Sequence, residues 1–361
     1  MITKPILLCL GFLSLFVVAD AQTKNKRGST RPAKKQDINS NPIFKLTRDT
    51  VHTNVEGRLY HALLINDKYY TLYEERDPSS TLSIKKCYII NKNGKVEREI
   101  NLPKAILQDN YPHLLYWHNR VIVNTQFYPK TFLFDSDKNE FVQNPEAIKV
   151  PLFESDDWEI TSECHGEFGS TIYFKNKNTN STYTSKAGCP LIINKLGMDY
   201  FANMSGSAYD YISEIPSIPP ASGNKMPAEK TVFQYDFMAN FYIPTSFQYN
   251  GVLYHIYNSA SNLFDPSEKK ERTIIIKDSV KIGTIYNGVF TPVYTLKDKC
   301  HIELQQQIAA DYQICLFHTE DRIEKGFKKD IPPYMEAKYG VIEIKGNEIK
   351  IHYFFSKRAK S

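Results

Sequence analysis

Four short turn signals punctuate this chain between runs of β-branched and aromatic residues. Asn-Gly occupies positions 93–94, 250–251 and 287–288, and the reversed pair Gly-Asn occupies 346–347. Asn and Gly readily adopt the positive φ angles that a two-residue hairpin turn requires. Each signal therefore predicts two adjacent antiparallel strands. Because the signals recur from one end of the chain to the other, they predict an all-β fold.

The residues around these turns have the texture of strands. From Val96 to Leu102, apolar or long side chains alternate with polar ones, as in a half-buried strand. Tyr and Phe are abundant, at 24 and 21 residues, and aromatic residues favour strands. A helix is conceivable only at Ile302–Ala310, where a strand flanked by loops fits nearly as well. Residues 213–230 contain four prolines, which predicts a long loop.

A repeat of 52 residues runs through the first half of the chain. His61, His113 and His165 each begin a segment in which a short polar turn is followed by an aromatic or β-branched strand. Similar units begin near residues 246 and 307, and a second strand pair follows most of them. Four strands every 50 to 60 residues is the spacing of a β-propeller blade. We therefore expect five or six four-stranded blades, with two β-sandwich domains as the alternative.

At the level of architecture, residues 43–355 resemble secreted β-propeller proteins, without the Trp-Asp or kelch glycine signatures. This resemblance implies that an N-terminal strand closes the ring by joining the last blade, which removes two exposed sheet edges. Residues 41–48 are placed to pair beside residues 348–354.

The N-terminus predicts export. Lys4 precedes an apolar run from Ile6 to Val18, and Ala19-Asp-Ala21 offers small residues for cleavage, which is the pattern of a secretory signal peptide. The run is too short for a membrane span. We expect a signal peptide over 1–21, a basic disordered leader over 22–40, a propeller over 41–356 and a basic tail over 357–361. The mature protein is expected to be soluble and either secreted or periplasmic.

The charge balance limits the classes of partner. Lys and Arg number 45 against 40 Asp and Glu, but nine of the cations lie in the leader and the tail. The folded body is therefore near neutral and gives no reason to expect nucleic acid as a partner. A protein or polysaccharide partner is compatible with this composition, and the sequence does not define an oligomeric state.

Five cysteines follow the signal peptide. In an exported protein their spacing suggests disulfides between neighbours in the sequence, Cys164 with Cys189 and Cys300 with Cys315, which leaves Cys87 free.

The densest group of reactive side chains includes His165 and Glu167. Together with His61 and His113, His165 would point three imidazoles toward a central channel if all three began inner strands. The favoured interpretation is that these histidines make local hydrogen bonds at strand starts. The Cys-His-Gly-Glu order lacks the paired-ligand spacing of a zinc site, so no metal and no cofactor is expected.

Carboxylates provide the other candidate chemistry. Asp157 lies in an acidic inter-blade loop beside Trp158, and a partner such as Asp236 from another blade would be needed for glycosidase acid and base catalysis. Trp158 and the second tryptophan, Trp117, are candidates for ligand binding; Trp158 either stacks on a sugar or fills a blade junction.

No nucleophile elbow, phosphate-binding loop or metalloprotease helix is present in the sequence. We therefore expect a binding or scaffold protein, rather than an enzyme, that meets a glycan, peptide or protein at one mouth of the ring. Residues 213–230 would act as a flap. The alternative is a carbohydrate-active hydrolase or lyase with carboxylates from different blades.

Overall fold

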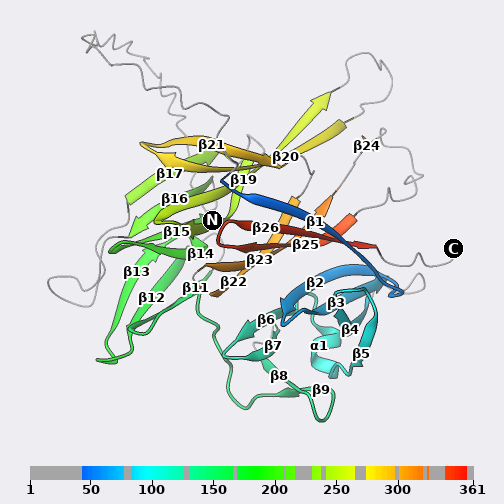
Figure 1. Cartoon of the computed structure of the whole chain (residues 1–361). Helices are drawn as coiled ribbons and strands as arrows, with labels where there is room; N and C mark the ends of the chain where they lie inside the picture. Colours follow the sequence, from blue (N-terminus) through cyan, green and yellow to red (C-terminus); the bar gives the residue numbers. More distant parts are fainter. Residues whose placement is uncertain are drawn as a thin grey trace, which may run out of the picture. The chain divides into compact units, whose positions relative to one another are not determined.

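The structure is a computed structural model, and it describes residues 43–76, 83–125, 130–165, 169–205, 209–215, 230–236, 241–264, 274–296, 301–309, 311–319, 323–324 and 338–355. The strands form six sheets, each built around four antiparallel strands that are neighbours in the sequence, and the sheets are the blades of a six-bladed β-propeller (Figure 1). The predicted β-propeller is confirmed, and of the expected five or six blades it has six. The sandwich alternative is wrong because the strands form six small sheets.

The first three blades follow one another along the chain. Blade 1 contains β2 (Arg58–Ile65), β3 (Lys68–Arg76), β4 (Ser83–Asn91) and β5 (Val96–Ile100). Blade 2 contains β6 (His113–Trp117), β7 (Arg120–Asn124), β8 (Thr131–Asp135) and β9 (Glu140–Gln143). Blade 3 contains β10 (Phe153–Glu154), β11 (Trp158–Cys164), β12 (Ser170–Asn176) and β13 (Thr182–Ala187). A five-residue helix, α1 (Lys104–Gln108), connects blades 1 and 2 and was not predicted.

The last three blades continue this order. Blade 4 contains β14 (Cys189–Leu196), β15 (Asp199–Ser205), β16 (Tyr209–Ile215) and β17 (Lys230–Asp236). Blade 5 contains β18 (Phe241–Tyr249), β19 (Val252–Phe264), β20 (Ile274–Tyr286) and β21 (Val289–Leu296), and β24 (Ile323–Glu324) pairs with β20. Blade 6 contains β22 (His301–Ala309), β23 (Tyr312–Thr319), β25 (Lys338–Lys345), β26 (Glu348–Phe355) and the N-terminal strand β1 (Lys45–His52).

Two local predictions concern residues 302–310, a candidate helix, and residues 213–230, a predicted loop. The candidate helix Ile302–Ala310 forms a strand instead as far as Ala309, where β22 ends, and residue 310 lies outside the described residues. Residues 213–215 end β16 and residue 230 begins β17, while 216–229, the rest of the predicted loop, lie outside the described residues. Within the described ranges, no helix has the length and hydropathy needed to cross a membrane.

The turn chemistry explains how the hairpins close. Asn250 and Gly251 both have positive φ, and so do Asn287 and Gly288, as the sequence predicts for two-residue turns. The turn at residues 93–94 is different, because only its glycine has a positive φ, at 82°. A Cβ on Gly94 would lie 1.8 Å from the carbonyl oxygen of His52, so this glycine also allows the turn to approach β1.

The ring closes through the N-terminal strand, as expected. β1 (blue) lies beside β26 (red) in Figure 1, and the two pair in parallel from Lys45 opposite Glu348 to His52 opposite Phe355. β1 is a fifth strand at the outer edge of blade 6, where it covers the edge that β26 would otherwise expose. Residues far apart in sequence therefore hold the first and last parts of the ring together.

The hydrophobic core lies between neighbouring blades. Separate clusters of buried side chains join blades 5 and 6, blades 6 and 1, blades 1 and 2, and blades 3 and 4. A smaller cluster around Ile212 and Ile243 joins blades 4 and 5. Among the described residues, the junction of blades 2 and 3 is the one junction without such a cluster. This junction contains a cavity instead.

Candidate functional site

The cavity beside blade 3 has a volume of about 350 Å³. Its wall comes from blades 2, 3, 4 and 6 and from the segment that connects β9 to β10. Thr161 and Ser162 of β11 form one side, and Asn124 and Thr131 of blade 2 form the opposite side. The inner strand β22 reaches it from the centre of the ring, so the cavity extends from the centre of the ring into the blade 2–blade 3 junction.

The cavity exists because the inner strand of blade 3 is short. β10 pairs with β11 only at Phe153 opposite Ile160 and Glu154 opposite Glu159. Continuing this register by two residues would place Pro151 opposite Ser162. Proline has no N–H to donate to a ladder, so the pairing ends there. The chain before β10 leaves the sheet and lines the cavity.

Blade 2 holds that departing segment. The backbone N–H of Ile148 donates to Thr131 Oγ1 at 2.7 Å, and its carbonyl accepts from Asn124 Nδ2 at 3.2 Å. The Thr131 hydroxyl in turn donates to Asn124 Oδ1 at 2.9 Å. These bonds hold Ile148 against blade 2.

Three consecutive glutamines of β22 face the cavity. The side-chain amide of Gln306 accepts from the N–H of Tyr116 at 3.1 Å and donates to its carbonyl at 2.7 Å, as a neighbouring strand would. Gln305 Nε2 donates to the carbonyl of Leu191 at 3.4 Å. Gln307 Oε1 is buried and has no hydrogen-bond partner within the described structure.

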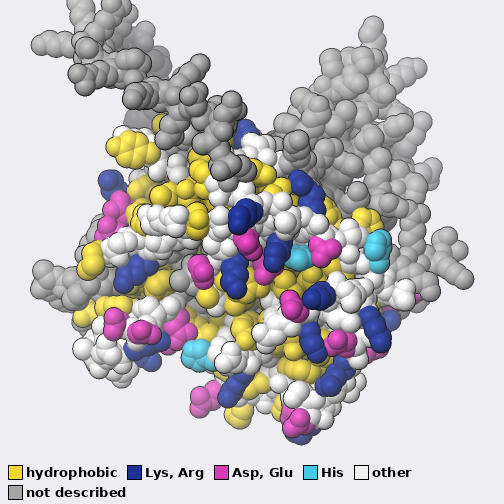
Figure 2. All heavy atoms as spheres, viewed as in Figure 1, with side chains coloured by type: hydrophobic (Ala, Val, Ile, Leu, Met, Phe, Trp, Pro, Cys, Tyr) yellow, Lys and Arg dark blue, Asp and Glu magenta, His cyan; other side chains and the backbone are white. Residues whose placement is uncertain are grey.

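The charged side chains among the described lining residues are all cationic. Lys130 and Lys149 line the cavity, and Lys149 also contacts Glu163. Among the described lining residues there is no Asp, Glu or His, and none is aromatic. Elsewhere the charges are mixed: on the face shown in Figure 2, Lys and Arg are interspersed with Asp and Glu. The cavity therefore suits neutral or negatively charged polar ligands better than cations.

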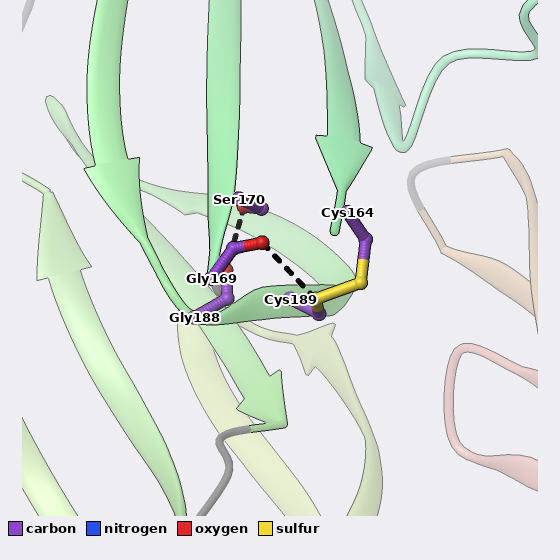
Figure 3. Close-up of a disulfide and its surroundings, with 5 residues drawn as sticks. All are labelled: Cys164, Gly169, Ser170, Gly188 and Cys189. Carbon is purple, nitrogen blue, oxygen red and sulfur yellow. Dashed lines mark hydrogen bonds between the residues drawn. A yellow bond between two sulfur atoms is a disulfide. The ribbon is translucent and has the colours of Figure 1, made fainter. Parts of the chain in front are cut away.

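A disulfide joins the two strands that border the cavity from blades 3 and 4. Cys164 ends β11 and Cys189 begins β14, and their sulfurs are bonded, with the Cα atoms 5.1 Å apart (Figure 3). The Ser170 hydroxyl donates to the Gly188 carbonyl at 2.7 Å and secures the connection into blade 4. The predicted Cys164–Cys189 pair is thus present, and it links two blades.

The second predicted disulfide, between Cys300 and Cys315, is wrong. Cys315 is a buried free thiol, as is Cys87, for which a free thiol was predicted. In the β22–β23 ladder Cys315 lies opposite Gln305, whereas His301 lies opposite His318. Cys300 itself lies outside the described residues.

Two of the three repeat histidines lie on the inner strands of blades 1 and 2. His61 on β2 and His113 on β6 have ring centroids 6.3 Å apart and line a small cavity of about 40 Å³, together with Gln305 and Gln306. Burial lowers the pKa of His113 below its ordinary value. The third histidine, His165, is exposed in the turn between β11 and β12 and lines neither cavity. The repeat failed there because the inner strand of blade 3 is β10, which lies upstream of His165.

The candidate carboxylates are not brought together as a catalytic pair. Asp157 is exposed in the first turn of blade 3, where its Oδ1 accepts from Asn178 Nδ2 at 2.8 Å. Asp236 ends β17, and its backbone lies opposite Tyr209, the first residue of β16. In a four-stranded meander these positions are at opposite ends of the blades. Glu167 lies outside the described residues.

Both tryptophans are held by contacts within the protein. Trp158 is buried in the cluster between blades 3 and 4, which matches its predicted alternative of filling a blade junction. Trp117 stacks on His118, with ring centroids 3.9 Å apart, and donates its indole N–H to Glu154 at 2.8 Å. Lys177 Nζ also contacts Glu154, at 2.6 Å. This group ties the turns of blades 2 and 3 together outside the cavity.

Sequence reasoning did not identify the cavity wall. The available signals were the run of three glutamines in a strand and Pro151 just before β10. Among the described residues there is no cluster of three or more side chains suited to holding a metal ion. No protein-family model matches the chain, and no curated protein matches its sequence.

Proposed function

We propose that this protein is an exported binding protein whose ligand occupies the cavity between blades 2 and 3. The observation that carries the proposal is the composition of the wall. Amides and hydroxyl groups line it beside apolar side chains, and no carboxylate or imidazole from the described residues faces it. A concave site with a few directed polar groups is typical of ligand binding.

The same wall favours binding over hydrolysis. Glycoside hydrolysis generally requires two carboxyl groups about 5 to 9.5 Å apart, one of them protonated. The larger cavity lacks such a pair among its described residues, and Asp157 lies in a turn outside it. Export is inferred from the signal-like sequence over residues 1–21. It is tested by N-terminal sequencing of protein recovered outside the cytoplasm, which should begin near Gln22.

The binding proposal is tested by filling the cavity. Panels of oligosaccharides and short peptides are screened by thermal shift, and calorimetry then measures the affinity of each hit. Thr161→Phe places a ring in the cavity, and Thr291→Phe makes the same change on the exposed edge strand β21. We expect Thr161→Phe to weaken binding at least tenfold and Thr291→Phe to leave it unchanged. Hits that both variants bind equally well would place the ligand elsewhere.

A further inference from the structure

We propose that the ligand is an extended peptide segment that pairs with β11 and replaces the missing part of the inner strand of blade 3. This inference rests on the proposed function and specifies its ligand class. The inner strands of the other blades, β2, β6, β14, β18 and β22, have 8, 5, 8, 9 and 9 residues, whereas β10 has two. The shortest of the other inner strands, β6, is therefore longer than β10 by three residues, or about 10 Å of strand.

The edge of β11 offers backbone partners for such a segment. The carbonyls of Trp158 and Ile160 accept from the β10 side, at 2.8 and 2.9 Å. Backbone groups alternate in direction along a strand. The N–H and carbonyl of Ser162 therefore point to the β10 side, as the carbonyls of Trp158 and Ile160 do. In the described part of the chain β10 ends before it reaches Ser162, which lines the cavity. An extended chain entering here would form ladder hydrogen bonds, as in strand addition to an open sheet edge.

The side chains of the wall also suit a peptide. Gln306 already binds both backbone groups of Tyr116, which shows that β22 presents amides at the correct height for an inner strand. Gln307, one residue further along, also lines the cavity. The described lining residues include no aromatic side chain on which a sugar ring could stack. Lys130 and Lys149 favour a neutral or acidic peptide over a basic one.

The test uses backbone substitution in the ligand. A random library of eight-residue peptides is selected on the full-length protein, and the best peptide is resynthesised with a single N-methyl group at each position in turn. We expect a period of two: N-methylation at alternate positions weakens binding about tenfold, because it removes a ladder hydrogen bond and adds a clash. The intervening positions, whose N–H groups point away from β11, tolerate the change. A scan without this period would overturn the inference.

Two substitutions in the protein test whether the peptide binds in the cavity. Gln307→Leu should weaken the peptide about fivefold, while Gln143→Leu, the same change on the exposed outer strand β9, should have no effect. If peptides fail to bind but an oligosaccharide binds in a manner that Thr161→Phe abolishes, the peptide inference is wrong and the cavity remains a binding site. If neither class shows binding that depends on Thr161, the proposed function fails as well.

Discussion

Buried polar residues join three of the blades in this ring. Ser246 of blade 5 donates its hydroxyl to Asn203 Oδ1 of blade 4 at 2.8 Å, and its Oγ lies 2.7 Å from His255 Nδ1. From blade 6, Gln313 donates to the Ser246 carbonyl and accepts from Thr245 Oγ1 at 2.5 and 2.9 Å. All these groups are buried, so removing one partner would leave others unsatisfied, at a cost of about 1 to 3 kcal/mol each.

His255 makes the stability of this network depend on pH. Burial lowers the pKa of His255 from 6.5 to about 3, so the folded protein holds the ring neutral while the unfolded chain takes up a proton near pH 6.5. Its contribution is therefore fully present above pH 6.5 and is lost as the pH falls toward 3, by about 1.4 kcal/mol per pH unit. Between pH 7 and 4.5, His255→Gln should lose about 2 to 3 kcal/mol less unfolding free energy than the wild type. Urea unfolding at both pH values measures this difference, and equal losses would contradict the assignment.

At the scale of strands, the sequence predicts most of what local turn chemistry controls. The positive-φ turns at residues 250–251 and 287–288 and the pairing of the N-terminal strand with β26 follow from residue type and pattern. The inner strand of blade 3 could not be predicted in the same way. Its two paired residues are too few to show a period, and its course depends on hydrogen bonds from Asn124 and Thr131 in another blade.

The disulfide shows the same division between local and long-range information. Spacing suggested the Cys164–Cys189 pair, but only the fold shows that it joins the end of β11 to the start of β14. Spacing was misleading for Cys315, because strand register, rather than separation in sequence, determines which residues lie opposite each other. Pairings between adjacent strands could be inferred from sequence patterns, whereas contacts between blades, apart from this disulfide, could not.

The inter-blade disulfide should contribute measurably to stability. It closes a loop of 25 residues, for which the loop-entropy account gives about 3 kcal/mol. We expect the double variant Cys164→Ser, Cys189→Ser to lose roughly that amount of unfolding free energy, and a reductant to lower the wild type to the same value. The reductant should not affect the double variant, because Cys87 and Cys315 are free thiols. A wild type indifferent to the reductant would show that the bond is absent.

In the whole molecule, five junctions between blades contain hydrophobic clusters and the sixth contains the cavity. The ring tolerates this gap because Trp117 of blade 2 binds Glu154 of blade 3 across it. Gln306 of blade 6 also holds Tyr116 of blade 2. β1 closes the ring at blade 6. The ring therefore stays closed although the inner strand of blade 3 is short.

The most direct test of this account is amide hydrogen exchange at Ser162 in the free, full-length protein. Ile160 lies opposite Phe153, so its amide should be protected, whereas the Ser162 amide, two residues along the same strand, faces the cavity and should exchange rapidly. Adding the selected peptide should protect Ser162 and leave Ile160 unchanged. Equal protection of both amides in the free protein would mean that the inner position of blade 3 is already filled. That result would contradict the claim that this position is open to a peptide.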